Sequence, residues 1–118
     1  MERKAAKELL HLRAWLEHVG HIANRGKSVY LADALLQEAG DSLMMKLGEA
    51  SKRLSQLGIL APGGVDWTLA IANRNFIVHQ YDEIDRSMTW ETLSRDLPAW
   101  NASLQPLFEA AQAALRED

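Results

Sequence analysis

The residues best suited to chemistry lie in one short segment, from Arg74 to Tyr81. Arg74 and Asn75 are followed by three apolar residues, then His79, one further residue and Tyr81, a pattern written R-N-x-x-x-H-x-Y. Histidine titrates near neutral pH and can move a proton to or from a hydroxyl, and the arginine fork matches the oxygens of a phosphate. Cleavage of RNA by its own 2′-hydroxyl needs little beyond these two functions. The segment therefore favours phosphoryl chemistry without a metal.

The same segment is typical of a helix end, which decides how its side chains are arranged. At about 100° per residue, Asn75 and His79 stack on one face, while Arg74 lies about 140° from His79. Tyr81 is expected at or just beyond the helix end, close to His79. The residues also fit a structural role, in which arginine and histidine at a helix C-terminus complement its dipole. Spacing alone favours this structural role.

Length and composition exclude several classes of protein. The chain has 118 residues, which suits one domain spanning 1–118, and its charged fraction of 25% is ordinary for a globular protein. The net charge of −3 gives no overall basic field, so a nucleic acid would need a local site. The chain has no cysteine and no apolar run of membrane length. We therefore expect a cytoplasmic protein without disulfides or a membrane segment.

The N-terminal segment, about Ala5 to Ala23, predicts an amphipathic helix. Its apolar residues alternate at spacings of four and three: Ala5, Leu9, Leu12, Leu16 and Val19. His18 and His21, three apart on this helix, could in principle hold a metal ion. No partner residues with recognisable ligand spacing accompany them, so no metal site is expected.

A second helix is predicted from about Ala32 to Leu57, and whether it begins before Gly40 stays open. Its apolar stripe consists of Leu36, Leu43, Leu47, Ala50, Leu54 and Leu57. Gly40 and Gly48 interrupt the pattern, and each costs about 1 kcal/mol of helix stability relative to alanine. We therefore expect these glycines to have a packing role, because a glycine lets another helix approach closely.

The third predicted helix, about Trp67 to His79, carries the motif and follows a glycine-rich loop. It has two apolar stripes: Leu69, Phe76 and Ile77 form one, and Trp67, Ile71 and Val78 form the other, on the side that Arg74 shares. One domain needs only one stripe for its own core. The stripe beside Arg74 therefore predicts a partner surface, with a helix buried on all sides as the alternative.

The C-terminal segment, about Met88 to Leu115, has the strongest periodicity. Its apolar residues are Trp90, Leu93, Leu97, Trp100, Leu104, Leu107, Ala111 and Leu115. Pro98 and Pro106 each remove a backbone donor, but the stripe keeps its phase, so we predict one kinked helix or two abutting helices. Strand signals are scarce. The chain is expected to be all-α, an up-and-down four-helix bundle with a kinked C-terminal helix.

Several local patterns resemble one known family. Residues 47–55, LGEASKRLS, resemble its G-E-A-x-x-x-L helix, and its later blocks are matched by Trp67, Arg74-Asn75, His79-x-Tyr81, Trp90-Glu91 and Asp96-Leu97-Pro98. In this order and spacing, the chain resembles the HepT-like branch of the HEPN superfamily from about Leu31 onward. Gln80 and Asp82 depart from the family pattern, which has Glu and an aromatic residue there in many members. These departures concern the charges around His79 and the packing of the Tyr81 segment.

The resemblance implies the toxin of a bacterial or archaeal toxin–antitoxin pair of a type II or type VII kind. Similar proteins are metal-independent ribonucleases that act through the motif, here Arg74 and His79. They form homodimers in which the motif helices face each other. Their usual partner is a minimal nucleotidyltransferase antitoxin, which in some pairs transfers AMP from ATP to the motif tyrosine, here Tyr81. Asn75 and Glu49 are expected to support the site, Glu49 either pairing with Arg74 or remaining an exposed carboxylate.

A different class of function uses the same fold. A non-catalytic helical module could dock to a nucleotidyltransferase or bind its substrate. The complete set of Arg74, His79 and Tyr81 favours the ribonuclease, because a scaffold does not need these residues. The expected partners are RNA, a second copy of the chain and the antitoxin, and no cofactor is expected.

Overall fold

The computed structural model describes residues 1–116, except for the side chain of Tyr81. Within this part of the chain the regular structure is helical throughout, so the all-α prediction is confirmed. In chain order the elements are α1 (Arg3–Ala23), α2 (Lys27–Ala32), α3 (Ala34–Gln56), α4 (Trp67–His79), η1 (Tyr81–Glu83), α5 (Arg86–Glu91), η2 (Thr92–Asp96) and α6 (Leu97–Arg116). Among the described residues, no helix combines the length and hydropathy that a membrane span requires.

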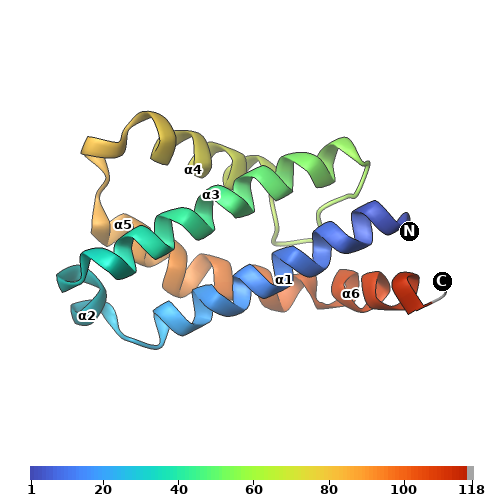
Figure 1. Ribbon diagram of the computed structural model, residues 1–118, viewed down its shortest axis with the longest axis horizontal. Helices are drawn as coiled ribbons and strands as arrows, with labels where there is room; N and C mark the ends of the chain where they lie inside the picture. Colours follow the sequence, from blue (N-terminus) through green and yellow to red (C-terminus); the bar gives the residue numbers. More distant parts are fainter. Residues whose placement is uncertain (117–118) are drawn as a thin grey trace.

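The long helices run in alternating directions, and both chain termini lie at the same end of the molecule (Figure 1). α1 packs against both α3 and α6, whereas α4 packs mainly against α3. The predicted four-helix bundle is not confirmed in that form, because α2 is an additional helix and η2 joins α5 to α6. The helix that carries the motif therefore lies at one side of the molecule, supported mainly by α3.

The core lies where α1, α3 and α6 meet. The whole apolar stripe predicted for α1 is buried. On the other helices the buried apolar residues include Leu43, Leu47, Ala50 and Leu54 of α3, and Leu97, Trp100, Leu104, Phe108 and Ala111 of α6. Removal of this apolar surface from water is the main favourable contribution to folding. The three helices thus form the base on which α4 packs, mainly through α3.

The start of α3, which the sequence left open, is set by a side-chain cap. Asp33 is the N-cap residue, and its carboxylate accepts hydrogen bonds from the backbone N–H groups of Leu35 at 2.9 Å and Leu36 at 3.3 Å. Such a cap satisfies N–H groups that have no partner within the helix. α3 therefore begins at Ala34, and Gly40 lies inside it.

Both glycines inside α3 have the packing role that we predicted. A β-carbon on Gly40 would lie 2.7 Å from Cδ1 of Leu93 in η2. A β-carbon on Gly48 would lie against Cβ of Arg74 and 2.7 Å from the carbonyl oxygen of Ala70, both in α4. The absence of a side chain at Gly48 is therefore what lets the backbones of α3 and α4 approach so closely.

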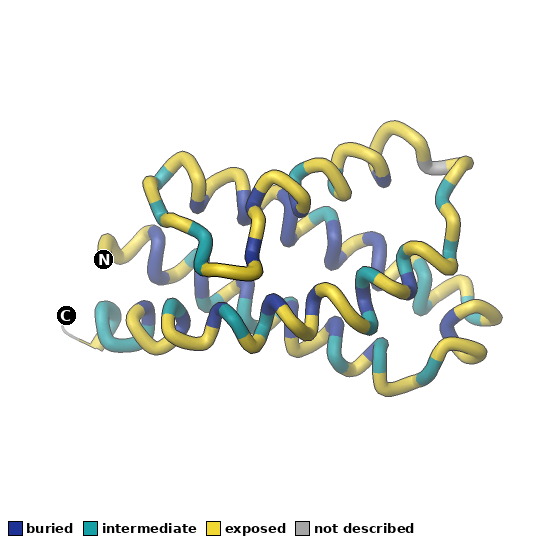
Figure 2. The backbone as a smooth tube through the Cα atoms, turned by 180° about the vertical axis from the view of Figure 1, so that it is seen from behind, coloured by how far each residue is buried: buried dark blue, intermediate teal, exposed yellow. Residues whose placement is uncertain are grey.

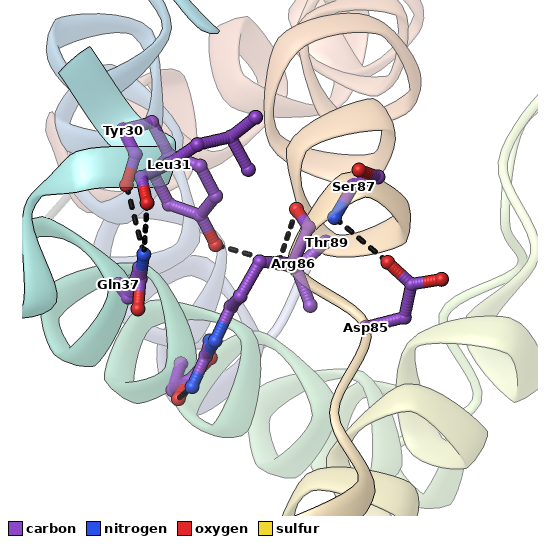
Figure 3. A network of polar contacts seen from close by, with 8 residues as sticks. Tyr30, Leu31, Gln37, Asp85, Arg86, Ser87 and Thr89 are labelled. Atoms are coloured by element: carbon purple, nitrogen blue, oxygen red, sulfur yellow. Dashed lines mark hydrogen bonds and ion pairs between the residues drawn. The ribbon is translucent and has the colours of Figure 1, made fainter. Parts of the chain in front are cut away.

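The short helix α2 was not predicted from the sequence. Its one buried residue, Tyr30, shares a hydrogen bond of 2.6 Å with Oγ1 of Thr89 in α5 (Figure 3). Nε2 of Gln37 donates to the carbonyl oxygen of Tyr30 at 3.0 Å. Beside them, Arg86 of α5 donates two hydrogen bonds, of 2.6 and 2.9 Å, to the buried carboxylate of Asp41 in α3. This network joins α2, α3 and α5 at one end of the molecule.

The C-terminal helical stretch, residues 86–116, departs from α-helical geometry at η2, which is a π-helical turn. The N–H of Leu97 donates to the carbonyl oxygen of Thr92, five residues back. In a regular α-helix the ring of Pro98 would clash with the carbonyl of Ser94, and a wider turn just before the proline relieves that clash. Pro106 lies within α6. The predicted kink is therefore not confirmed, and the irregularity that the structure shows is the π-helical turn.

α4 has the predicted bounds, but burial does not separate its two apolar stripes in the way that we expected. Trp67, assigned to the partner surface, is buried in the chain's own core, where its Nε1 donates to the carbonyl oxygen of Ile59 at 3.0 Å. Ile77 is buried, but Leu69 and Phe76 of the same predicted stripe are 57% and 48% exposed. The reason is that α4 rests on α3 along one narrow line, which leaves most of its outer side in solvent (Figure 2).

The contact at Gly48 leads to a prediction about stability. We expect Gly48→Ala to lower the free energy of unfolding by about 1–3 kcal/mol, because the added methyl group forces α3 and α4 apart. Urea denaturation followed by far-UV circular dichroism measures the effect. Gly20→Ala in α1 is the matched control, since a β-carbon there meets nothing within 4 Å. The control should gain up to about 1 kcal/mol from helix propensity. An equal gain at Gly48 would show that the close approach is not required.

Candidate active site

The motif occupies the last two turns of α4 and the residues just beyond it. At the other end of this helix, the carboxylate of Asp66 accepts a hydrogen bond of 2.9 Å from the N–H of Thr68. The hydrogen bond from the Thr68 side chain is the largest cause that holds the pKa of the Asp66 carboxyl below its ordinary value. α4 ends at His79, and the N–H of Gln80 still donates to the carbonyl oxygen of Phe76 at 2.8 Å. The N-cap at Asp66 and the hydrogen bond from Gln80 mark the two ends of the helix that positions the motif.

Arg74 lies on the side of α4 that faces α3. Its Nη2 is 3.6 Å from Oε1 of Glu49 in α3, so the ion pair, one of the two alternatives for Glu49, is present. Its Nη1 donates to Oδ1 of Asn75 at 3.0 Å. Its Nε is buried and makes no hydrogen bond to any residue that the structure describes. The Arg74 side chain as a whole is 33% exposed, so a ligand can reach it from outside.

The pair between Arg74 and Glu49 is a weak restraint. Its separation of 3.6 Å is longer than a strong charge-assisted hydrogen bond, and the Glu49 side chain is 46% exposed. Exposed ion pairs of this kind contribute only about 0–1 kcal/mol. A phosphate group can therefore displace the carboxylate from the guanidinium at little cost.

Within the described part of one chain, no hydrogen bond or ion pair joins His79 to Arg74. It is exposed at the end of α4, about 140° around the helix from Arg74. Asn75, which shares a face with His79, makes its hydrogen bond to Arg74 instead of the imidazole. The structure thus groups Arg74 with Asn75 and Glu49 and leaves His79 on the outer surface of α4.

The two tyrosines of the chain differ in what the structure shows of them. Tyr81, the predicted modification site, is the first residue of η1, and its side chain lies outside the described part of the chain. Tyr30 is fully buried, and its hydroxyl is hydrogen-bonded to Thr89. An enzyme that modifies the folded protein therefore has no access to Tyr30.

A groove of about 500 Å³ runs between α3 and α4 beside Arg74. Its lining consists of Gly48, Glu49, Lys52, Arg53, Gln56, Ile71, Arg74 and Asn75. Three of these residues are cationic and one is anionic, so the groove is locally positive although the net charge of the chain is −3. Sequence reasoning missed Lys52 and Arg53 as site residues. The sequence feature that could have identified them is their position about one turn after Gly48, where another helix was expected to approach.

The cations of the groove are not equally available to a ligand. Nη2 of Arg53 lies 2.6 Å from Oε1 of Glu8 in α1, and Nε of Arg53 donates to the same oxygen at 2.8 Å. This hydrogen bond raises the pKa of Arg53 above its ordinary value, and Glu8 neutralises its charge. Within the described part of the chain, Lys52 has no such partner. Lys52 and Arg74 are therefore the cations that the groove offers to an anion.

Exposed apolar side chains flank the motif on both sides of α4. Val78, which is 39% exposed, and the half-buried Ile71 lie on the side that Arg74 shares. Leu69 and Phe76 are exposed on the opposite side. Large apolar side chains grouped on one exposed helix are typical of an interaction surface. The predicted partner surface thus keeps Ile71 and Val78 but loses Trp67.

His18 and His21 of α1 lie near each other, with ring centroids 6.2 Å apart. Over residues 1–116, no group of three or more His, Cys, Asp or Glu side chains is placed to hold a metal ion. α1 also packs against α3 and α6, away from the motif helix. The histidine pair is therefore separate from the candidate active site.

Comparison with known protein families identifies the family of the chain. The family model described as ribonuclease HepT-like matches residues 12–107, a span that includes the groove between α3 and α4 and every motif residue. No solved structure gives a significant match. Since the family model covers most of the chain, this protein belongs to the HepT-like ribonuclease family.

Proposed function

We propose that this protein is an endoribonuclease that cleaves RNA without a metal ion, with Arg74 and His79 as its catalytic residues. The observation that carries the proposal is the position of Arg74, which contacts Glu49 and Asn75 and lines a positive groove. The Arg74 side chain is 33% exposed beside this groove, so an anionic ligand can reach it. Membership of a ribonuclease family makes an RNA phosphate the natural candidate.

In the proposed mechanism the 2′-oxygen of RNA attacks the adjacent phosphorus, and the P–O5′ bond breaks. The 2′-hydroxyl loses a proton as its oxygen bonds to phosphorus, and the leaving 5′-oxygen gains one. His79 serves in this proton transfer. Arg74 binds the phosphate and stabilises the charge that develops on its oxygens. The products are a 2′,3′-cyclic phosphate and a 5′-hydroxyl.

The proposed active site is shared between two copies of the chain. Within one copy, His79 does not line the groove that holds Arg74. A second α4 packed against the side with Ile71 and Val78 would bring its own His79 toward that groove. Burial of these apolar side chains favours such a homodimer, because it removes their surface from water.

The biological role that we propose is that of a toxin in a bacterial or archaeal toxin–antitoxin pair, active in the cytoplasm. A minimal nucleotidyltransferase antitoxin would neutralise it by transferring AMP to Tyr81. Burial of Tyr30, the other tyrosine, supports this choice of acceptor. An AMP group two residues from His79 would add bulk and negative charge where RNA is proposed to bind. The modification would therefore block the substrate by steric hindrance and by repulsion.

Arg74→Ala and His79→Ala test the catalytic assignment. We expect cleavage to fall by about 10²–10⁴-fold without the histidine and by about 10²–10³-fold without the arginine. A time course with end-labelled RNA in the presence of EDTA measures the rates, and chromatography of the products identifies the 2′,3′-cyclic phosphate. Circular dichroism should show unchanged helical content.

His18→Ala and Arg95→Ala are the matched controls for that experiment. Both side chains are exposed, on α1 and η2, and neither lies on the motif helix. Each control should retain the full rate. Products that carry 5′-phosphates, or loss of cleavage on chelation, would contradict the mechanism.

Mixing the two inactive variants tests the shared site. A dimer with one Arg74→Ala chain and one His79→Ala chain contains one intact pair, formed by the arginine of one chain and the histidine of the other. Random exchange should therefore restore about a quarter of the wild-type rate in a two-fold symmetric dimer. If the cleavage rate does not recover, the arginine and the histidine of each active site belong to the same chain.

Sedimentation equilibrium tests the same interface directly. Val78→Glu places a charge beside Arg74 in the proposed contact, so it should convert the dimer to a monomer and abolish cleavage. Leu60→Glu is the control, because Leu60 is 86% exposed in the loop that precedes α4. A wild-type chain that is monomeric at micromolar concentration would remove the shared site from the proposal.

Co-expression with a minimal nucleotidyltransferase, the proposed antitoxin, tests the modification of Tyr81. We expect intact-mass analysis to show an added AMP group on the wild type and on Tyr30→Phe, but not on Tyr81→Phe. Modified protein should no longer cleave RNA. Full neutralisation without any adduct would show that the partner acts by forming a complex alone.

A further inference from the structure

Lys52 is a cation in the lining of the groove between α3 and α4 that the proposed mechanism does not use. It lies four residues after Gly48, and side chains four apart share one side of a helix. Because Gly48 has no side chain, α4 lies so close that Arg74 packs directly over it. Lys52 and Arg74 therefore line the same groove, Lys52 from α3 and Arg74 from α4.

Charge in the groove is unevenly balanced. Arg53 is neutralised by Glu8 of α1 at 2.6 Å. Glu49 is the carboxylate in the groove lining. Its Oε1 lies 3.6 Å from Nη2 of Arg74, so its negative charge offsets the charge of Arg74. Lys52 pairs with no carboxylate of the described residues. An unpaired ammonium group beside a guanidinium raises the local potential and attracts anions.

The size of the groove limits what the anion can be. A volume of about 500 Å³ is that of a small-ligand pocket, so it accommodates a short stretch of single strand but not a duplex. Because the net charge of the chain is −3, no overall positive field attracts a polyanion to the rest of the surface. A nucleic acid strand is therefore drawn to the place where Lys52 and Arg74 meet.

We propose that Lys52 binds the phosphate next to the one held by Arg74, so that the groove takes up two consecutive phosphates of single-stranded RNA. This inference rests on the ribonuclease function proposed above. Arginine offers a fork of fixed geometry to the reacting phosphate, whereas lysine is a compact charge that binds a phosphate without a fixed direction. Phosphate contacts set the register of a strand and do not read its bases. Lys52 is thus a positioning residue that places the scissile phosphate on Arg74.

Binding and cleavage are measured separately, so that the two proposals can fail independently. Binding is measured in the His79→Ala background, by fluorescence anisotropy of a fluorescein-labelled, mixed-sequence single-stranded RNA at several salt concentrations. Lys52→Gln should weaken binding by roughly three- to tenfold near 0.1 M salt and reduce the slope of log K against log [salt] by about 0.7. Lys52→Arg keeps the charge and should retain the wild-type slope.

Lys46→Gln is the matched control for Lys52→Gln. Lys46 is exposed on the same helix and carries the same charge, but it does not line the groove. The inference is wrong if the slope is unchanged in Lys52→Gln, or if Lys46→Gln changes it equally, since the effect would then come from overall charge.

Cleavage kinetics with His79 intact provide the second readout. Loss of a positioning contact should raise KM about as much as it weakens binding and leave kcat nearly unchanged. A fall in kcat at constant KM would instead place Lys52 in the chemical step and overturn the positioning role. If the wild-type chain and the Lys52 variants do not cleave RNA, but the salt slope of binding still depends on Lys52, the catalytic proposal fails and the phosphate site stands.

Discussion

The close contact between α3 and α4 at Gly48 is the constraint on which the candidate site depends. A side chain at this position would collide with Cβ of Arg74 and with the backbone of Ala70. Without one, the stem of Arg74 packs over the surface of α3, and the guanidinium comes within 3.6 Å of Glu49. The same approach opens a groove whose other wall carries Lys52, one turn further along α3. One missing β-carbon thus places three charged groups in a single site.

A second constraint is that α4 is supported mainly from one side. α1 buries its apolar stripe against both α3 and α6, whereas the buried residues of α4 are Trp67, Ala70 and Ile77. At the end of α3 that follows α2, the buried Asp41 binds Arg86 and keeps α5 against the base. The motif helix therefore packs on the other helices with its outer surface open. This arrangement fits a site that is completed by a second molecule, because it leaves apolar side chains next to the motif in solvent.

Much of the fold could be predicted because its signals are local. The periodicity of α1, the bounds of α4 and the glycine contacts all agree with expectation, and Glu49 adopts one of its two expected alternatives, the ion pair with Arg74. α2 was missed because a helix of six residues with one buried side chain has no periodicity to detect. At the C-terminus, Phe108 is buried where Leu107 was expected, since steps of three and four residues from Leu104 fit a helical stripe equally well. The π-helical turn before Pro98 was missed because a proline marks an irregularity without specifying its form.

The sequence by itself determined the class of fold, the family, the residues of the motif and the need for glycine inside α3, since all of these follow from residue type and spacing along one chain. Only the tertiary structure decided which side of α4 is buried. Trp67 belongs to the core and Phe76 to the surface because one flank of a helix becomes interior only where another helix covers it, and spacing alone does not say where that helix lies. In the same way, Lys52 joins the site through space, by the approach of α4 to Gly48, and not through its place in any motif.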